Sequence, residues 1–184
     1  EVAMDPRWQK IDQLVSEQKM QQAAELAAEL REGAEGAENE ELYTRALIKE
    51  AQLRTALHGY ATVVELLRSA PWPEEPRLHT ALSLFYAQGL VSYHQAYRWE
   101  IGQRERVAQE ASGQEAVDLE RWTSQQIVAE ANRTYAETWD RRQSWGDAPL
   151  GLLAEYLRQN NYPPRIRGTL RDTITYLWVE LLAD

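Results

Sequence analysis

The chain has 184 residues, of which 43 % are hydrophobic and 27 % charged, with a formal net charge of −9. This composition is typical of a globular protein with a sizeable core, in one domain or at most two small ones. The acidic balance argues against a nucleic-acid partner, because phosphate binding requires a basic field. Only residues 141–184 carry a slight excess of basic groups, six against five acidic ones.

The sequence contains no cysteine. A disulfide framework, a thiolate nucleophile and a cysteine-ligated metal are therefore excluded. The run from Leu78 to Tyr97 contains no Asp, Glu, Lys or Arg, but it holds several His, Ser, Thr and Gln residues. These polar groups are too many for a helix in lipid, so we expect no membrane span in this segment.

The first seventy residues carry the hydrophobic period of helices, and strand signals are nearly absent. Asp5 is a predicted N-cap, because the proline after it suits the first position of a helix. Residues 33–39 are predicted to form a loop, and Gly59 to break a helix. The first seventy residues are thus predicted to form four helices, arranged as two consecutive helix pairs of about 35 residues each. This length is close to the tetratricopeptide period, although the side-chain pattern of that repeat is not kept. The four predicted helices begin at Pro6, Met20, Glu40 and Tyr60.

The sequence PWPEEP at 71–76 ends the fourth helix and restarts the chain. A long central helix is predicted over about 77–101. Its first part, Leu78–Val91, is apolar on all sides and should be enclosed by neighbouring helices. The last helix opens at Thr169, where Asp172 supplies a capping-box pattern. Two further helices are expected, at about 118–141 and 149–158.

These elements predict an all-α fold. We expect about eight helices, stacked as antiparallel hairpins around the central helix in a tetratricopeptide-like arrangement. Residues 1–184 should form a single helical domain, with two helix pairs in 1–70 and the long-helix core in 76–184.

No catalytic, metal or cofactor site is predicted. A Ser hydrolase would carry its nucleophile on a Gly-flanked turn, and none occurs. His79 and His94 are fifteen residues apart on one predicted helix, about 22 Å at the helical rise, so they cannot share a metal ion. We therefore expect a protein that is not an enzyme.

Two clusters of residues are candidate binding sites. The first is either structural, with Tyr97 and Trp99 wedged against neighbouring helices while the arginines cap, or a surface for an extended peptide or glycan. Its members are Tyr97, Arg98, Trp99, Arg104, Trp122 and Tyr135. The second cluster precedes a helix N-terminus, where a cation is unfavourable unless a bound anion or a carboxylate of the chain compensates its charge. It consists of Arg165, Arg167 and Arg171.

Four short motifs stand in an order that resembles a known family. They are W-x2-ID-x-L at 8–14, YRWEIGQR at 97–104, DLERW with a following I-x7-Y at 118–135, and GTLRDTITYL at 168–177. In this order they resemble the N-terminal helical region of bacterial alpha-2-macroglobulin-like proteins. These are very large extracellular or periplasmic proteins that resemble protease-trapping macroglobulins.

The resemblance is carried by particular residues. An Arg-Trp-x-Ile-x-x-Arg element of the family is matched by Arg98, Trp99, Ile101 and Arg104. A Trp-containing helix of the family is matched by Trp122 and Tyr135. An Arg-x-Thr-Leu-x-Asp element is matched by Arg167, Thr169, Leu170 and Asp172.

The resemblance implies a periplasmic or extracellular location and a non-catalytic helical domain of a protease-inhibitor protein. Such a domain would be a scaffold or would dock a protein, either downstream domains of the same chain or another polypeptide. Without cysteine, the chain cannot hold the thioester of this family. The alternative is a free-standing helical-repeat adaptor that binds an extended peptide. That adaptor would expose four residues on one concave wall: Tyr97, Trp99, Arg104 and Tyr135.

Overall fold

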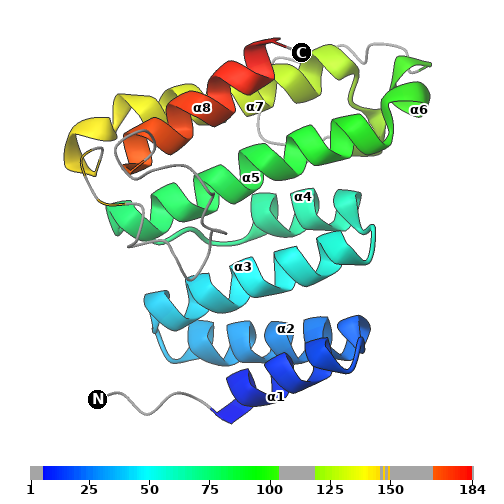
Figure 1. Cartoon of the computed structure of the whole chain (residues 1–184), viewed down its shortest axis with the longest axis vertical. Helices are drawn as coiled ribbons and strands as arrows, with labels where there is room; N and C mark the ends of the chain where they lie inside the picture. The colour runs from blue at the N-terminus through cyan, green and yellow to red at the C-terminus, as the bar shows by residue number, and fades with distance from the viewer. Residues whose placement is uncertain (1–5, 104–118, 146, 148, 150–167, 184) are drawn as a thin grey trace. The chain divides into compact units, whose positions relative to one another are not determined.

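The computed structural model describes residues 6–103, 119–145, 147, 149 and 168–183 (Figure 1). These residues form eight α-helices and two short 3-10 helices, so the all-α prediction is confirmed. An isolated antiparallel bridge joins Pro149 to Thr169. The helices are α1 (Pro6–Ser16), α2 (Met20–Gly36), α3 (Glu40–Ala56), α4 (Tyr60–Ser69), α5 (Pro76–Ala96), α6 (Arg98–Gly102), α7 (Ser124–Asp140) and α8 (Leu170–Ala183).

The chain divides within α5 into two compact units. The first unit contains α1 to α4 and the beginning of α5, up to Leu82. The second unit contains the rest of α5 together with α6, α7 and α8. The single domain expected over the whole chain and the tetratricopeptide-like stacking stay predictions.

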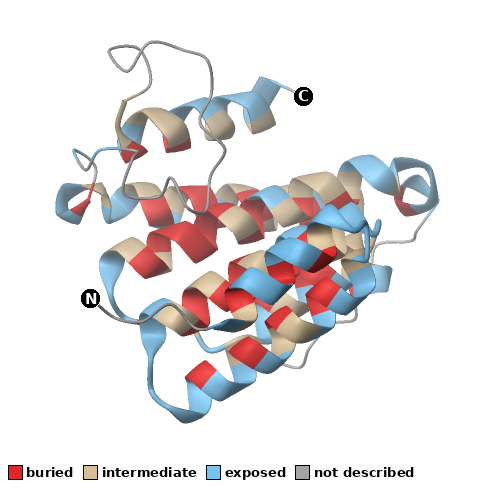
Figure 2. Cartoon of the chain, turned by 60° about the horizontal axis from the view of Figure 1, so that its bottom comes forward, coloured by how far each residue is buried: buried red, intermediate tan, exposed pale blue. Residues whose placement is uncertain are grey.

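In the first unit, each helix packs against the one before it in the chain, from α1 to α4 (Figure 1). Small side chains make the close approach of α1, α2 and α3 possible, since Ala23, Ala24 and Ala27 are completely buried. On α1 the buried residues are Trp8, Ile11 and Leu14. Figure 2 shows the buried positions in red along each helix, as the helical period of the sequence predicts.

The three turns that connect α1 to α4 share one geometry. Gln18, Glu38 and His58 have φ values of 60°, 53° and 62°, in the left-handed region. After each of them, the next residue donates its backbone N–H to a carbonyl five residues back: Lys19 to Leu14 at 2.8 Å, Asn39 to Ala34 at 3.0 Å, and Gly59 to Arg54 at 2.9 Å. This pattern is the Schellman motif, here with a side chain where glycine is usual. The motif recurs every 20 residues along the chain.

Two predicted helix ends are wrong. Helix α2 continues into the segment 33–39 as far as Gly36, because Ala34 is buried and extends the apolar face of the helix. The central helix ends at Ala96, since Tyr97 leaves helical geometry with φ −114° and ψ 22°. The chain then restarts as α6, in which Ile101 is buried.

In the second unit, capping side chains set where α7 and α8 begin. Thr123 and Gln126 form a reciprocal capping box, so α7 begins at Ser124 and not near 118. At the start of α8, Asp172 accepts from the backbone N–H of Thr169 at 3.0 Å, and its own N–H donates to Oγ1 of Thr169. The capping box predicted there is confirmed. The predicted helix at 149–158 lies almost entirely outside the described residues. Asp5, the predicted N-cap of the first helix, also lies outside them.

Helix α8 packs against α7. Leu170 and Ile174 are buried, while Trp178 is half-buried and donates from Nε1 to Oδ1 of Asn132 at 2.7 Å. No helix in the described ranges is long and apolar enough to cross a membrane.

Candidate functional site

The first predicted cluster does not form one surface. Trp122 and Tyr135 are buried in the core, and Tyr97 is half-buried. Trp99 is 76 % exposed, contrary to the expectation that it wedges between helices. Ile101, two residues further on, is buried, and residues two positions apart on a helix do not share a face. Arg104 lies outside the described residues. The concave wall that an adaptor would require is not formed, because Tyr135 is buried.

Of the second cluster, only Arg171 is described. Its Nη2 lies 2.9 Å from Oδ1 of Asp147, so Arg171 forms an ion pair with a carboxylate of the same chain. Both side chains are largely exposed, and such a pair contributes little to stability. Arg165 and Arg167 lie outside the described residues.

The three histidines contact other groups of the protein. His58 lies beside Tyr60, His79 beside the carbonyl of Pro73 at 3.2 Å, and His94 beside Oγ of Ser124 at 2.6 Å. In the part of the chain that the structure describes, no three His, Asp or Glu residues are grouped as metal ligands would be.

Arg98 lies on the rim of an apolar pocket in the second unit. The pocket has a volume of about 310 Å³ and includes residues of α5, α6, α7 and α8. Its polar members include His94, Arg98 and Ser124, and no carboxylate belongs to the part of the lining that the structure describes. The apolar part of its lining consists of Val91, Ile127, Val128, Ala131 and Leu181.

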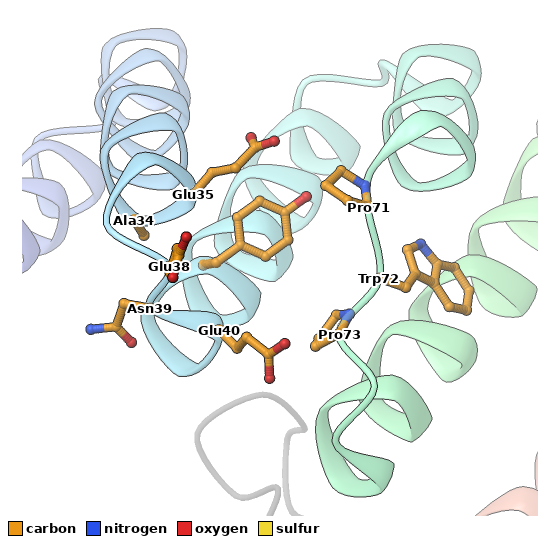
Figure 3. A pocket seen from close by; sticks show the side chains of 9 residues that line it. Ala34, Glu35, Glu38, Asn39, Glu40, Pro71, Trp72 and Pro73 are labelled. Atoms are coloured by element: carbon orange, nitrogen blue, oxygen red, sulfur yellow. The ribbon is translucent and has the colours of Figure 1, made fainter.

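A second pocket lies in the first unit and is shown in Figure 3. It has a volume of about 150 Å³ and lies between the α2–α3 turn and the segment that follows α4. Its lining consists of Ala34, Glu35, Glu38, Asn39, Glu40, Tyr43, Pro71, Trp72 and Pro73. The sequence analysis assigned no binding role to any of these residues. The density of Glu residues around the turn was the only signal that could have pointed to them.

Tyr43 is the buried polar residue of this pocket. It is 5 % exposed, and its hydroxyl has no hydrogen-bond partner among the residues with described positions. Burial, with a further contribution from the negative charge of Glu35, raises the pKa of Tyr43 to about 12. The phenol is therefore neutral at ordinary pH and able to donate or accept a hydrogen bond.

The outer face of α8 is apolar. Tyr176, Val179 and Leu182 are 40 %, 58 % and 66 % exposed, and they follow one another at a spacing of three residues. Residues at this spacing are neighbours on a helix surface. Of the five large hydrophobic residues that are exposed in the described ranges, these three are on α8; the other two are Leu57 and Trp99.

Comparison with protein-family models, with curated proteins and with solved structures finds no match to this chain. By its described structure the chain is an all-α protein with two compact units.

Proposed function

We propose that the chain is a non-catalytic helical scaffold that docks a protein surface through α8. We place it in an exported alpha-2-macroglobulin-like protease inhibitor of bacteria, on the basis of the four sequence motifs. The observation that carries the docking role is the apolar outer face of α8, formed by Tyr176, Val179 and Leu182. Contiguous exposed apolar side chains are typical of protein interaction sites.

The energetic reason is the removal of these side chains from water. Complete burial of a Val or Leu side chain is worth about 1.5–3 kcal/mol. Replacing two of the three residues by serine would therefore remove a large part of the docking free energy. It would leave the fold intact, because Val179 and Leu182 are exposed and the buried contacts of α8 come from Leu170 and Ile174.

The docking test compares hydrogen exchange of the α8 amides in this chain alone and in the intact gene product. We expect slower exchange in the intact protein, and loss of this protection in the double variant Val179→Ser, Leu182→Ser. The matched control, Leu57→Ser with Trp99→Ser, replaces two exposed apolar residues elsewhere and should retain the protection. Equal exchange of α8 in both proteins would contradict the docking role.

The family assignment has its own test. We expect the reading frame to encode a Cys-x-x-Gln thioester motif downstream of this segment. We also expect the purified chain neither to inhibit nor to cleave proteases, because the thioester chemistry of the family requires a cysteine that the chain does not have. Inhibition of a trypsin-like protease by this chain alone would contradict the proposal.

A further inference from the structure

The pocket of the first unit presents hydrogen-bond acceptors. Glu35, Glu38 and Glu40 carry carboxylates, which only accept when ionised. Pro71 and Pro73 form part of the opposite wall and have no backbone N–H to donate. No Lys, Arg or His belongs to the lining as the structure describes it. A lining of this kind favours a ligand that carries positive charge and only donates hydrogen bonds.

The carboxylates that line this pocket form no ion pair with described residues, whereas the neighbouring carboxylates do. Glu41 is paired with Arg77, and Glu50 with Arg31 and Arg54. Glu35, Glu38 and Glu40 form no ion pair with any described residue, although they lie within six positions of one another. Three like charges around one small space repel each other, and a cation placed between them would relieve that repulsion.

Tyr43 is a second and independent indication of a ligand. It lines the pocket, and its hydroxyl is buried without a partner among the described residues. A buried polar group without a hydrogen bond is costly, so a donor that reached this oxygen would be favoured. The ring of Tyr43 adds an aromatic surface, which attracts cations.

The orientation of the side chains agrees with this assignment. In Figure 3, Glu35 and Glu40 extend toward the Pro71–Pro73 segment, whereas Asn39 and the indole of Trp72 point away from the pocket. Oδ1 of Asn39 accepts from the backbone N–H of Leu42 at 3.1 Å and caps α3. Nε1 of Trp72 donates to the carbonyl of Leu67 at 2.8 Å. These two polar side chains therefore serve the fold, and the carboxylates remain for a ligand.

We propose that this pocket, formed by Glu35, Glu38, Glu40 and Tyr43, binds the guanidinium group of an arginine on a partner polypeptide. Its volume of about 150 Å³ suits one side chain, since pockets for drug-sized ligands measure roughly 300–1,000 Å³. Arginine fits better than lysine because its planar fork offers five N–H donors to acceptors in several directions. This site is in the first unit, so the inference goes beyond the docking role of α8 and stands or fails independently of it.

The test titrates the peptide acetyl-Gly-Arg-Gly-amide into the full chain and follows backbone amide shifts by NMR. We expect saturable shifts at residues 34–43 and around Trp72, and weaker binding as salt is raised. The peptide with citrulline in place of arginine keeps the shape and loses the charge. It should bind about tenfold more weakly or worse, because charge-assisted hydrogen bonds are the stronger ones.

Variants decide whether this pocket is responsible. The triple variant Glu35→Gln, Glu38→Gln, Glu40→Gln should abolish the saturable shifts, and Tyr43→Phe should weaken binding several-fold without lowering the melting temperature. The matched control makes the same charge change on exposed carboxylates outside the pocket, at Glu25, Glu29 and Glu65. It should bind like the unaltered chain. A third peptide, with lysine in place of arginine, keeps the charge without the planar fork and should also bind more weakly. Equal loss in both triple variants, equal binding of the citrulline peptide or the lysine peptide, or the absence of saturable shifts would overturn the assignment.

Discussion

Glu50 is a carboxylate buried between α2 and α3, with an exposed fraction of 1 %. Its Oε2 accepts a hydrogen bond from Nε of Arg31 at 2.9 Å, and its Oε1 lies 2.7 Å from Nη2 of Arg54. Burial by itself lowers the pKa of Arg31, but the hydrogen bond and the charge of Glu50 outweigh it and raise the pKa. The three residues thus form a charge network that joins two helices of the first unit.

The substitution Glu50→Gln keeps the shape of the side chain and removes its charge. Removing one partner of a buried ion pair costs about 3–5 kcal/mol, because the remaining charge is left without compensation. The side chains of Arg31 and Arg54 keep exposed fractions of 16 % and 29 %, so water compensates part of this loss. We therefore expect a decrease of about 3 kcal/mol in the free energy of unfolding, measured by urea denaturation followed by circular dichroism.

Two comparisons make this prediction refutable. Glu25→Gln removes the same charge from an exposed position on α2 and should change the free energy of unfolding by less than about 0.5 kcal/mol. Arg31→Met should cost more than Arg54→Met, because Arg31 is the more buried of the two. A loss below about 1 kcal/mol for Glu50→Gln would show that the network behaves like a surface ion pair and would refute the prediction.

Two further predictions concern the backbone and the buried phenol. Gln18→Gly should raise the free energy of unfolding by about 0.5–1 kcal/mol in the same assay, because Gln18 has φ 60° and glycine adopts this conformation without a steric cost. A lower free energy of unfolding in the variant would contradict this prediction. The pKa of Tyr43 is raised to about 12 in the folded chain, whereas in the unfolded chain it has its ordinary value near 10. As the pH rises above 10, the phenol therefore ionises first in the unfolded chain. The contribution of Tyr43 to the free energy of unfolding is fully present below pH 10 and is lost toward pH 12. Between pH 9 and 11 the unaltered chain should lose about 1 kcal/mol more than Tyr43→Phe, and equal losses would refute this.

Several features of the fold could be predicted because they depend on neighbours in sequence. The restart at Pro76 follows from the conformational limits of proline, and the capping box of Thr169 and Asp172 follows from their spacing. Leu78, Leu82 and Leu90 lie in the part of α5 that is apolar on all sides, and they are buried as that pattern predicts. In these cases the local backbone geometry and the side-chain period are sufficient.

The candidate sites were less accessible to sequence reasoning. Trp99 was expected to pack against neighbouring helices and is exposed instead, and no proline or glycine marks the break at Tyr97. Glu50 was not singled out, because a carboxylate on an amphipathic helix is usually solvated, and its burial depends on Arg31 from another helix. The pocket around Tyr43 was missed because its walls lie about thirty residues apart in the chain.

The sequence by itself determined the helical class and most helix starts, since both depend on interactions within a few residues. It also determined the absence of thiol chemistry, because the chain has no cysteine. Only the tertiary structure decided which charged and aromatic side chains are buried, paired or exposed. The physical reason is that burial depends on which helices are neighbours, and a helical period says which face is apolar but not what covers it. Glu50 between two arginines, Tyr43 without a hydrogen-bond partner and the open face of α8 are three results of that packing.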